Sequence, residues 1–208
     1  DFPDKVAFAQ NRYSYEVKDV EHVIDWIYSK NIKHKKIHLM GHSRGGGIAI
    51  LQPVSLTMVH GFDKPNRKEG LRAGIRHIRS LTEKPIGFNA LIEKGSEKYF
   101  QQMSEWIDVA LEEDIRFFVT SLGKPDWVCE KVHAKGGVVY HDVTSRKWAE
   151  KGKECGVDGL ICVNDRAGGH LGELTMEEMY EQLSDMGLPL ICAGGIGSEI
   201  ELAEALKI

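Results

Sequence analysis

The chain has 208 residues, of which 42% are hydrophobic and 28% are charged, and its formal net charge is −4 at pH 7. This composition is typical of a soluble domain that buries a core, and the small negative charge excludes the basic surfaces that bind nucleic acid or anionic membranes. The sequence has no apolar run long enough to cross a bilayer, so we expect neither a nucleic acid nor a membrane as a partner.

The first fifty residues predict a helix, a strand, a sharp turn and a second helix. Apolar residues at helical spacing occupy 19–30, a short apolar run at 37–40 predicts a buried strand, and a helix begins in 45–51. Between the strand and the second helix lies Gly41-His42-Ser43-Arg44-Gly45, a G-x-S-x-G pattern. Its glycines permit the strained turn that lifts a serine hydroxyl clear of a sheet, so Ser43 is a candidate nucleophile.

The pattern of apolar and polar residues changes over 52–69, and we place a domain boundary between residues 52 and 53. In the predicted second domain, 53–208, apolar runs alternate regularly with amphipathic segments. Helices are predicted at 71–81, 97–112, 126–134, 145–155, 175–186 and 200–206. Strands are predicted at 85–90, 116–121, 137–143, 159–164 and 189–194.

These strands are continuous apolar runs, which is typical of parallel strands covered on both faces. Helices between them predict right-handed β/α crossovers, and hence an α/β fold built as a barrel or as a doubly wound sheet. Because a complete barrel needs eight β/α units, these five strands predict a partial, TIM-barrel-like arrangement.

Two glycine-rich segments follow the last two predicted strands. The first is Arg166-Ala167-Gly168-Gly169-His170-Leu171-Gly172, which follows the apolar run GLICVN. Glycines at a strand end allow a ligand to approach the backbone, and a histidine there can act as a general base. The second segment, 189–198, has the sequence PLICAGGIGS, and such a turn presents N–H groups to a phosphate. Each pattern taken singly is commonly a simple turn, but their order and spacing favour a shared ligand site.

Together these two segments resemble the nitronate monooxygenase (2-nitropropane dioxygenase) family, and the resemblance extends over about residues 67–208. The upstream segments RHIRSLTEKPIGFNA and FFVTSLGKPDWVCEKVHAKGGVVYHDV are also similar to that family. The resemblance implies FMN as cofactor and the oxidation of nitronates or nitroalkanes by oxygen. It also implies that the family's first and last barrel strands have no counterpart in this chain, which would impair flavin retention.

The same resemblance implies a role for particular residues. His170 would be the catalytic base that deprotonates a nitroalkane or orients a nitronate. The implied cofactor-binding residues are Asn89, His141, Gly168, Gly169, Gly194, Gly195 and Ile196. For His141, packing in the core is an equally open alternative.

Residues 1–51 resemble a fragment of an α/β-hydrolase, so the chain has the character of a chimera. This resemblance implies an alternative function, a serine hydrolase or esterase acting through Ser43. The acid and the histidine of such an enzyme follow the serine on later strands, and the sequence past residue 52 does not supply that framework. A non-catalytic chimeric scaffold is the third hypothesis.

Two expectations concern the protein's surroundings. The cysteines, Cys129, Cys155, Cys162 and Cys192, form no CxxC pair, and no signal peptide precedes them, so we expect a cytoplasmic protein without a metal site. An unclosed barrel exposes sheet edges that favour association, and we therefore expect a homo-oligomer.

Overall fold

The structure is a computed structural model that describes residues 66–81, 83–92, 96–168 and 171–208. The chain divides into two compact units between Thr82 and Glu83. The expectations about 1–51, which include the Ser43 motif, lie outside the described residues. The boundary between residues 52 and 53 lies outside them too and stays a prediction.

Helix α5, Arg67–Leu81, is the described part of the first unit. It begins at Arg67 rather than at the predicted Leu71. The Oδ1 atom of Asn66 accepts a hydrogen bond from the N–H of Lys68 at 3.0 Å, which satisfies one of the N–H groups that a helix start leaves unpaired. Ile75 and Ile78 are buried, in keeping with the amphipathic pattern.

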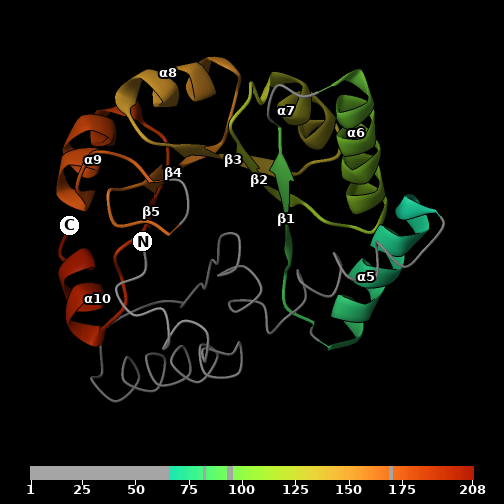
Figure 1. Ribbon diagram of the computed structural model, residues 1–208, viewed down its shortest axis with the longest axis horizontal. Coiled ribbons are helices and arrows are strands. Elements are labelled where there is room, and N and C mark those ends of the chain that lie inside the picture. The colour runs from blue at the N-terminus through green and yellow to red at the C-terminus, as the bar shows by residue number, and fades with distance from the viewer. Residues whose placement is uncertain (1–65, 82, 93–95, 169–170) are drawn as a thin grey trace. The chain divides into compact units, whose positions relative to one another are not determined.

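The second unit alternates strands and helices along its whole length (Figure 1). Its strands are β1 (Gly87–Leu91), β2 (Phe117–Ser121), β3 (Val138–Val143), β4 (Gly159–Val163) and β5 (Leu190–Ala193). Its helices are α6 (Glu97–Glu112), α7 (Asp126–His133), α8 (Arg146–Glu154), α9 (Met176–Leu183), the 3-10 turn Ser184–Met186 and α10 (Glu199–Ala205). Among the described residues, no helix is both long and apolar enough to cross a membrane.

The five strands form one parallel sheet in the order β1-β2-β3-β4-β5. A doubly wound sheet reverses its strand order, whereas this sheet adds each strand on the same side. Right-handed crossovers then place every helix on the same face, as in a barrel. The second unit therefore has the α/β architecture of a barrel segment, and the predicted fold class is confirmed. Within the described sheet, β1 and β5 each pair on one side only.

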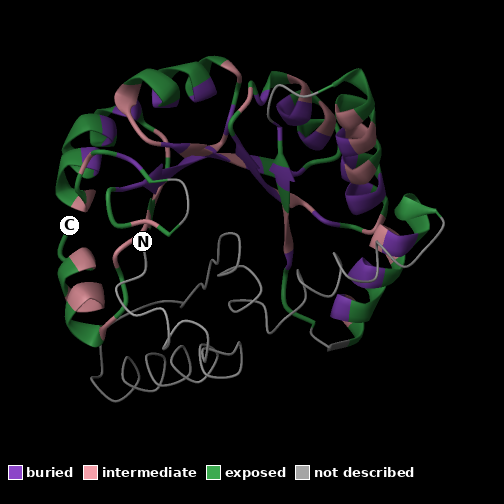
Figure 2. Ribbon diagram, viewed as in Figure 1, coloured by how far each residue is buried: buried purple, intermediate pink, exposed green. Residues whose placement is uncertain are grey.

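The two faces of the sheet have different neighbours. Ala90, Thr120 and Leu160 lie in one row across the strands and are fully buried. Figure 2 shows buried segments, in purple, along the strands and on the helices that cover them. On the other face the ring of Tyr140 lies directly over Gly159, where a Cβ atom would come within 2.4 Å of it. Glycine at position 159 thus makes room for an aromatic side chain on the inner face.

Candidate functional site

Two loops lie side by side at the carboxyl end of the sheet, one after β4 and one after β5. The N–H of Asn164 donates to the carbonyl of Ala193 at 3.1 Å, which continues the β4–β5 pairing past the strands. Parallel barrels carry their ligand sites at this end. The structure thus brings together the two glycine-rich segments that the sequence singles out.

Gly194 and Gly195 form the turn after β5 in conformations that L side chains rarely adopt, with φ of 124° and 74°. A Cβ atom on Gly194 would meet Asn164 Oδ1 at 2.2 Å and the Ala167 nitrogen at 2.6 Å. A Cβ atom on Gly195 would meet the Arg166 Cβ at 2.8 Å. Both glycines are therefore required by the backbone and by the close approach of the β4 loop.

Glu201 links the start of α10 to both loops. Its carboxylate accepts hydrogen bonds from the N–H of Gly197 at 2.8 Å and from the hydroxyl of Ser198 at 3.1 Å, and it pairs with the guanidinium of Arg166. The Gly197 hydrogen bond, followed by those from Arg166 and Ser198, lowers the pKa of Glu201. The side chain is therefore a carboxylate at neutral pH, and it is the acceptor for one N–H group of the turn, that of Gly197.

The turn after β5 offers part of what the phosphate of a flavin mononucleotide requires. The N–H groups of Gly195 and Ile196 donate to no acceptor within the described part of the chain. Successive N–H groups in a glycine turn form an anion-binding concavity. Two donors are thus available for a phosphate, beside the exposed guanidinium of Arg166.

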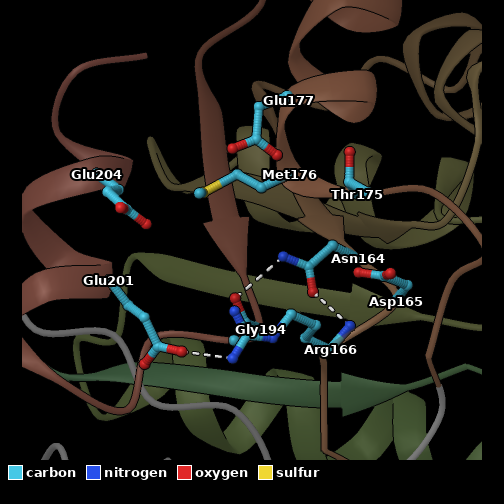
Figure 3. Close-up of a pocket in the computed structure, with 10 residues that line it drawn as sticks. Asn164, Asp165, Arg166, Thr175, Met176, Glu177, Gly194, Glu201 and Glu204 are labelled. Carbon is cyan, nitrogen blue, oxygen red and sulfur yellow. Dashed lines mark hydrogen bonds and ion pairs between the residues drawn. The ribbon is translucent and has the colours of Figure 1, made fainter.

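A pocket of about 150 Å³ opens beside the contact between the loops after β4 and β5 (Figure 3). Its wall carries the side chains of Asp165, Glu177, Glu201 and Glu204, with Arg166 as its cationic group. Four carboxylates around one guanidinium disfavour a phosphate, and the volume is below that of typical cofactor pockets. The pocket, which Gly194 and Gly195 also line, therefore does not hold a whole flavin, and the binding of its phosphate at this turn stays a prediction.

The remaining predicted residues are dispersed over the structure. Gly168 is exposed in the β4 loop, with no atom within 4 Å of the position that a Cβ would take. Gly169 and His170 lie outside the described residues. Asn89 is exposed on β1, in the row of Val119, Tyr140 and Gly159 on the inner face of the sheet. The assignment of these residues to a flavin site stays a prediction.

His141 lies on the opposite face from Asn89, in the buried row with Thr120 and Leu160. Its Nδ1 atom is 2.9 Å from the hydroxyl oxygen of Thr120, and a Cβ on Gly152 of α8 would lie 3.4 Å from its ring. Burial lowers the pKa of His141, while the Asp142 carboxylate acts in the opposite direction. The geometry favours packing under α8, and a cofactor contact by His141 stays a prediction.

This burial predicts a pH dependence of stability. Because the pKa of His141 is lower in the folded chain than in the unfolded one, its contribution is complete above the ordinary histidine pKa and is lost as the pH falls below it. We expect His141→Asn, which keeps a polar atom near Thr120 and cannot titrate, to reduce the loss of unfolding free energy between about pH 7.5 and pH 5.5. One proton changes that free energy by at most about 1.4 kcal/mol per pH unit.

Urea unfolding of both proteins at each pH measures the effect. The variant His77→Asn is the matched control, since His77 is exposed on α5 and its replacement leaves a buried imidazole in place. Parallel pH profiles for the wild type and His141→Asn would contradict the prediction.

Sequence reasoning missed three residues that hold the two loops together: Asn164, Arg166 and Glu201. Asn164 ends the apolar run GLICVN and Arg166 opens the glycine-rich segment, but neither pattern assigned them a role. Nothing in the linear spacing indicates that Glu201 meets Arg166, since the contact depends on where α10 begins. Within the described ranges, no three His, Cys, Asp or Glu side chains are grouped to hold a metal ion.

Comparison with known proteins finds one matching family, described as nitronate monooxygenase, over residues 43–208. The match therefore begins at Ser43, within the motif that suggested a hydrolase.

Among curated proteins, the chain is similar to the HisF subunit of imidazole glycerol phosphate synthase from Dictyoglomus turgidum. The two are 35% identical over 164 residues, which cover 79% of this chain and 55% of that protein. It is also similar to the putative monooxygenase Rv1533 of Mycobacterium tuberculosis, 31% identical over 106 residues, which cover 49% of this chain and 28% of that protein. The chain thus spans about half or less of the length of these relatives.

Solved structures show the same architecture. FabK from Thermotoga maritima superposes with a TM-score of 0.59 and 26% identity, over 70% of this chain and 45% of that chain. A nitroalkane oxidase from Streptomyces ansochromogenes superposes with a TM-score of 0.56 and 20% identity, over 67% of this chain and 52% of that chain. At such identities the second likeness supports the fold alone.

Proposed function

Because this chain belongs to the nitronate monooxygenase family, we propose that it is part of a flavin-dependent oxidoreductase that uses FMN and oxygen to oxidise nitronates. The name of the relative Rv1533, a putative monooxygenase, supports the class of reaction. The chain spans about half of the FabK chain and less than a third of Rv1533, so the activity of the whole protein belongs to the proposal.

The observation that carries the proposal is the contact between the loops after β4 and β5. At this contact Arg166 and Ala167 lie next to a turn whose N–H groups at Gly195 and Ile196 have no acceptor among the described residues, at the carboxyl end of a parallel sheet. In the proposed site the N–H groups of Gly195 and Ile196 hold the phosphate of FMN, and Gly168 and Gly169 lie along the flavin. Asn89 reaches the cofactor from the inner face, where it is exposed.

The protein's own contribution to the reaction is proton transfer and orientation. A nitroalkane becomes a nitronate when a base removes the proton on the carbon beside the nitro group, and the electron pair of that C–H bond moves into the nitro group. His170 is proposed as this base, since a histidine accepts a proton near neutral pH. When bound, FMN supplies the redox chemistry that connects the nitronate to oxygen.

Visible spectroscopy tests the proposal directly. The purified protein is titrated with FMN, and oxygen uptake is then measured with a nitroalkane and with its nitronate. We expect bound flavin, seen as a shifted visible band, and oxygen uptake that depends on FMN. A chain that folds, and neither retains nor binds FMN, would sink the proposal.

A further inference from the structure

The strongest unassigned feature of the structure is the buried side chain of Asn164. This residue follows β4 directly and is 2% exposed. Its amide nitrogen donates to the carbonyl of Gly194 at 3.0 Å and approaches the Sγ atom of Cys192 at 3.8 Å. Its Oδ1 atom accepts a hydrogen bond from the N–H of Arg166 at 2.9 Å. One carboxamide therefore spans both loops (Figure 3).

The main chain of Asn164 makes further contacts with the same loops. Its carbonyl accepts hydrogen bonds from the N–H of Gly172 at 3.1 Å and from the N–H of Ala167 at 3.3 Å. Two described residues of the loop after β4, Ala167 and Gly172, are thus bonded to the main chain of Asn164. On the other side, the N–H of Asn164 is bonded to Ala193, just before the Gly194 turn.

Asn164 and Gly194 also fit each other sterically. The Oδ1 atom occupies the space that a side chain on Gly194 would need, since a Cβ there would lie 2.2 Å from it. A buried carboxamide whose donor and acceptor are both used favours one arrangement over its alternatives, because any shift leaves a buried polar group unpaired.

We propose that Asn164 is a positioning residue that holds the described ends of the loop after β4, at Arg166, Ala167 and Gly172, in register with the Gly194 turn before a ligand binds. The expected effect on FMN binding rests on the proposed function. The coupling of the two loops by one side chain does not depend on that function.

The test uses the substitution Asn164→Asp, which replaces the amide NH2 group of the side chain with an oxygen and keeps its size. The new oxygen replaces the donor to the Gly194 carbonyl and faces that carbonyl, while the acceptor for the Arg166 N–H is retained. Asn164→Ser is the second variant, since it keeps a short acceptor for Arg166, cannot reach Gly194 and adds no charge. It answers the question if Asn164→Asp does not fold.

Asp158 supplies the matched control at the other end of the same strand. It precedes β4, and its Oδ2 atom accepts a hydrogen bond from the N–H of Val139 at 2.7 Å, so it also ties β4 to a neighbouring strand. The substitution Asp158→Ala removes that tie at the amino end of the sheet. It distinguishes a general loss of stability from a specific loosening of the two loops.

Hydrogen exchange of the protein without added ligand is measured in peptides covering 165–172 and 194–198. We expect exchange in both peptides to rise at least about fivefold in Asn164→Asp and to stay unchanged in Asp158→Ala. We also expect the Kd for FMN to rise at least about tenfold, and the visible band of bound flavin to move toward that of free FMN.

The outcomes separate the two claims. Exchange that rises in one peptide only, in neither, or equally in the Asp158→Ala control would overturn the role of Asn164. Joint loosening of both peptides in a protein that never binds FMN would leave Asn164 as the coupling residue and remove the proposed function.

Discussion

Replacing Gly194 with alanine is expected to abolish FMN binding and to lower the free energy of unfolding by on the order of 3 kcal/mol. Two costs add at this position. The φ of 124° is strained for any L side chain, and the new Cβ would overlap Asn164 Oδ1 and the Ala167 nitrogen. Relief of the overlap must move the turn away from the β4 loop and misplace the N–H groups of Gly195 and Ile196. FMN titration and urea unfolding measure the two effects.

Gly187→Ala is the matched control for the strain alone. Gly187 has a φ of 69°, and no atom lies within 4 Å of the position that its Cβ would take. Its replacement should cost about 1 kcal/mol and leave FMN binding unchanged. If Gly194→Ala and Gly187→Ala have the same effect on FMN binding and on the free energy of unfolding, the close approach of the β4 loop to Gly194 does not contribute to either.

The second large effect is expected for His170→Asn, which should lower the rate of oxygen uptake with a nitroalkane by about 10²-fold to 10⁴-fold. The loss follows from the proposed role of His170 as the base. A nitronate supplied ready-made has already lost the proton in question, so its oxidation should fall much less. The binding of FMN should be retained, because the proposed phosphate donors, the N–H groups of Gly195 and Ile196, belong to the turn after β5.

The comparison of the two substrates identifies the role of His170. His133→Asn is the control, since His133 is exposed at the end of α7 and hydrogen-bonded to Asp158, away from the two loops. An equal loss with nitroalkane and nitronate would indicate that His170 orients the nitronate and does not act as the base. An unchanged rate with both substrates would remove His170 from the catalytic machinery.

The regular elements were largely predictable because they depend on local patterns. The predicted helix at 97–112 coincides with α6, and the predicted strand at 137–143 differs from β3 by one residue. The predicted helix at 175–186 ends as a 3-10 turn over Ser184–Met186, before Gly187 with its positive φ. Apolar periodicity and capping residues act within a few positions, so they can be read from the chain itself.

The candidate site was predictable only in part. The sequence located both glycine-rich segments, and for the turn after β5 the reason is visible, since the positive φ of Gly194 and Gly195 favours glycine. It left His141 open between pocket and core, and the choice depends on which face of β3 carries the ring. That face is fixed by the register with Thr120, which lies 21 positions away, and by the packing of α8 over the sheet.

The sequence by itself determined that this chain forms successive parallel β/α units and that two of its strand ends carry glycine turns, because periodicity and glycine requirements are local. The tertiary structure alone decided the strand order β1 to β5, the meeting of Arg166 with Glu201 and the position of Asn164 between the two loops. Each of these depends on contacts between residues about 20 or more positions apart. Such contacts form only when the crossovers bring neighbouring strands into register.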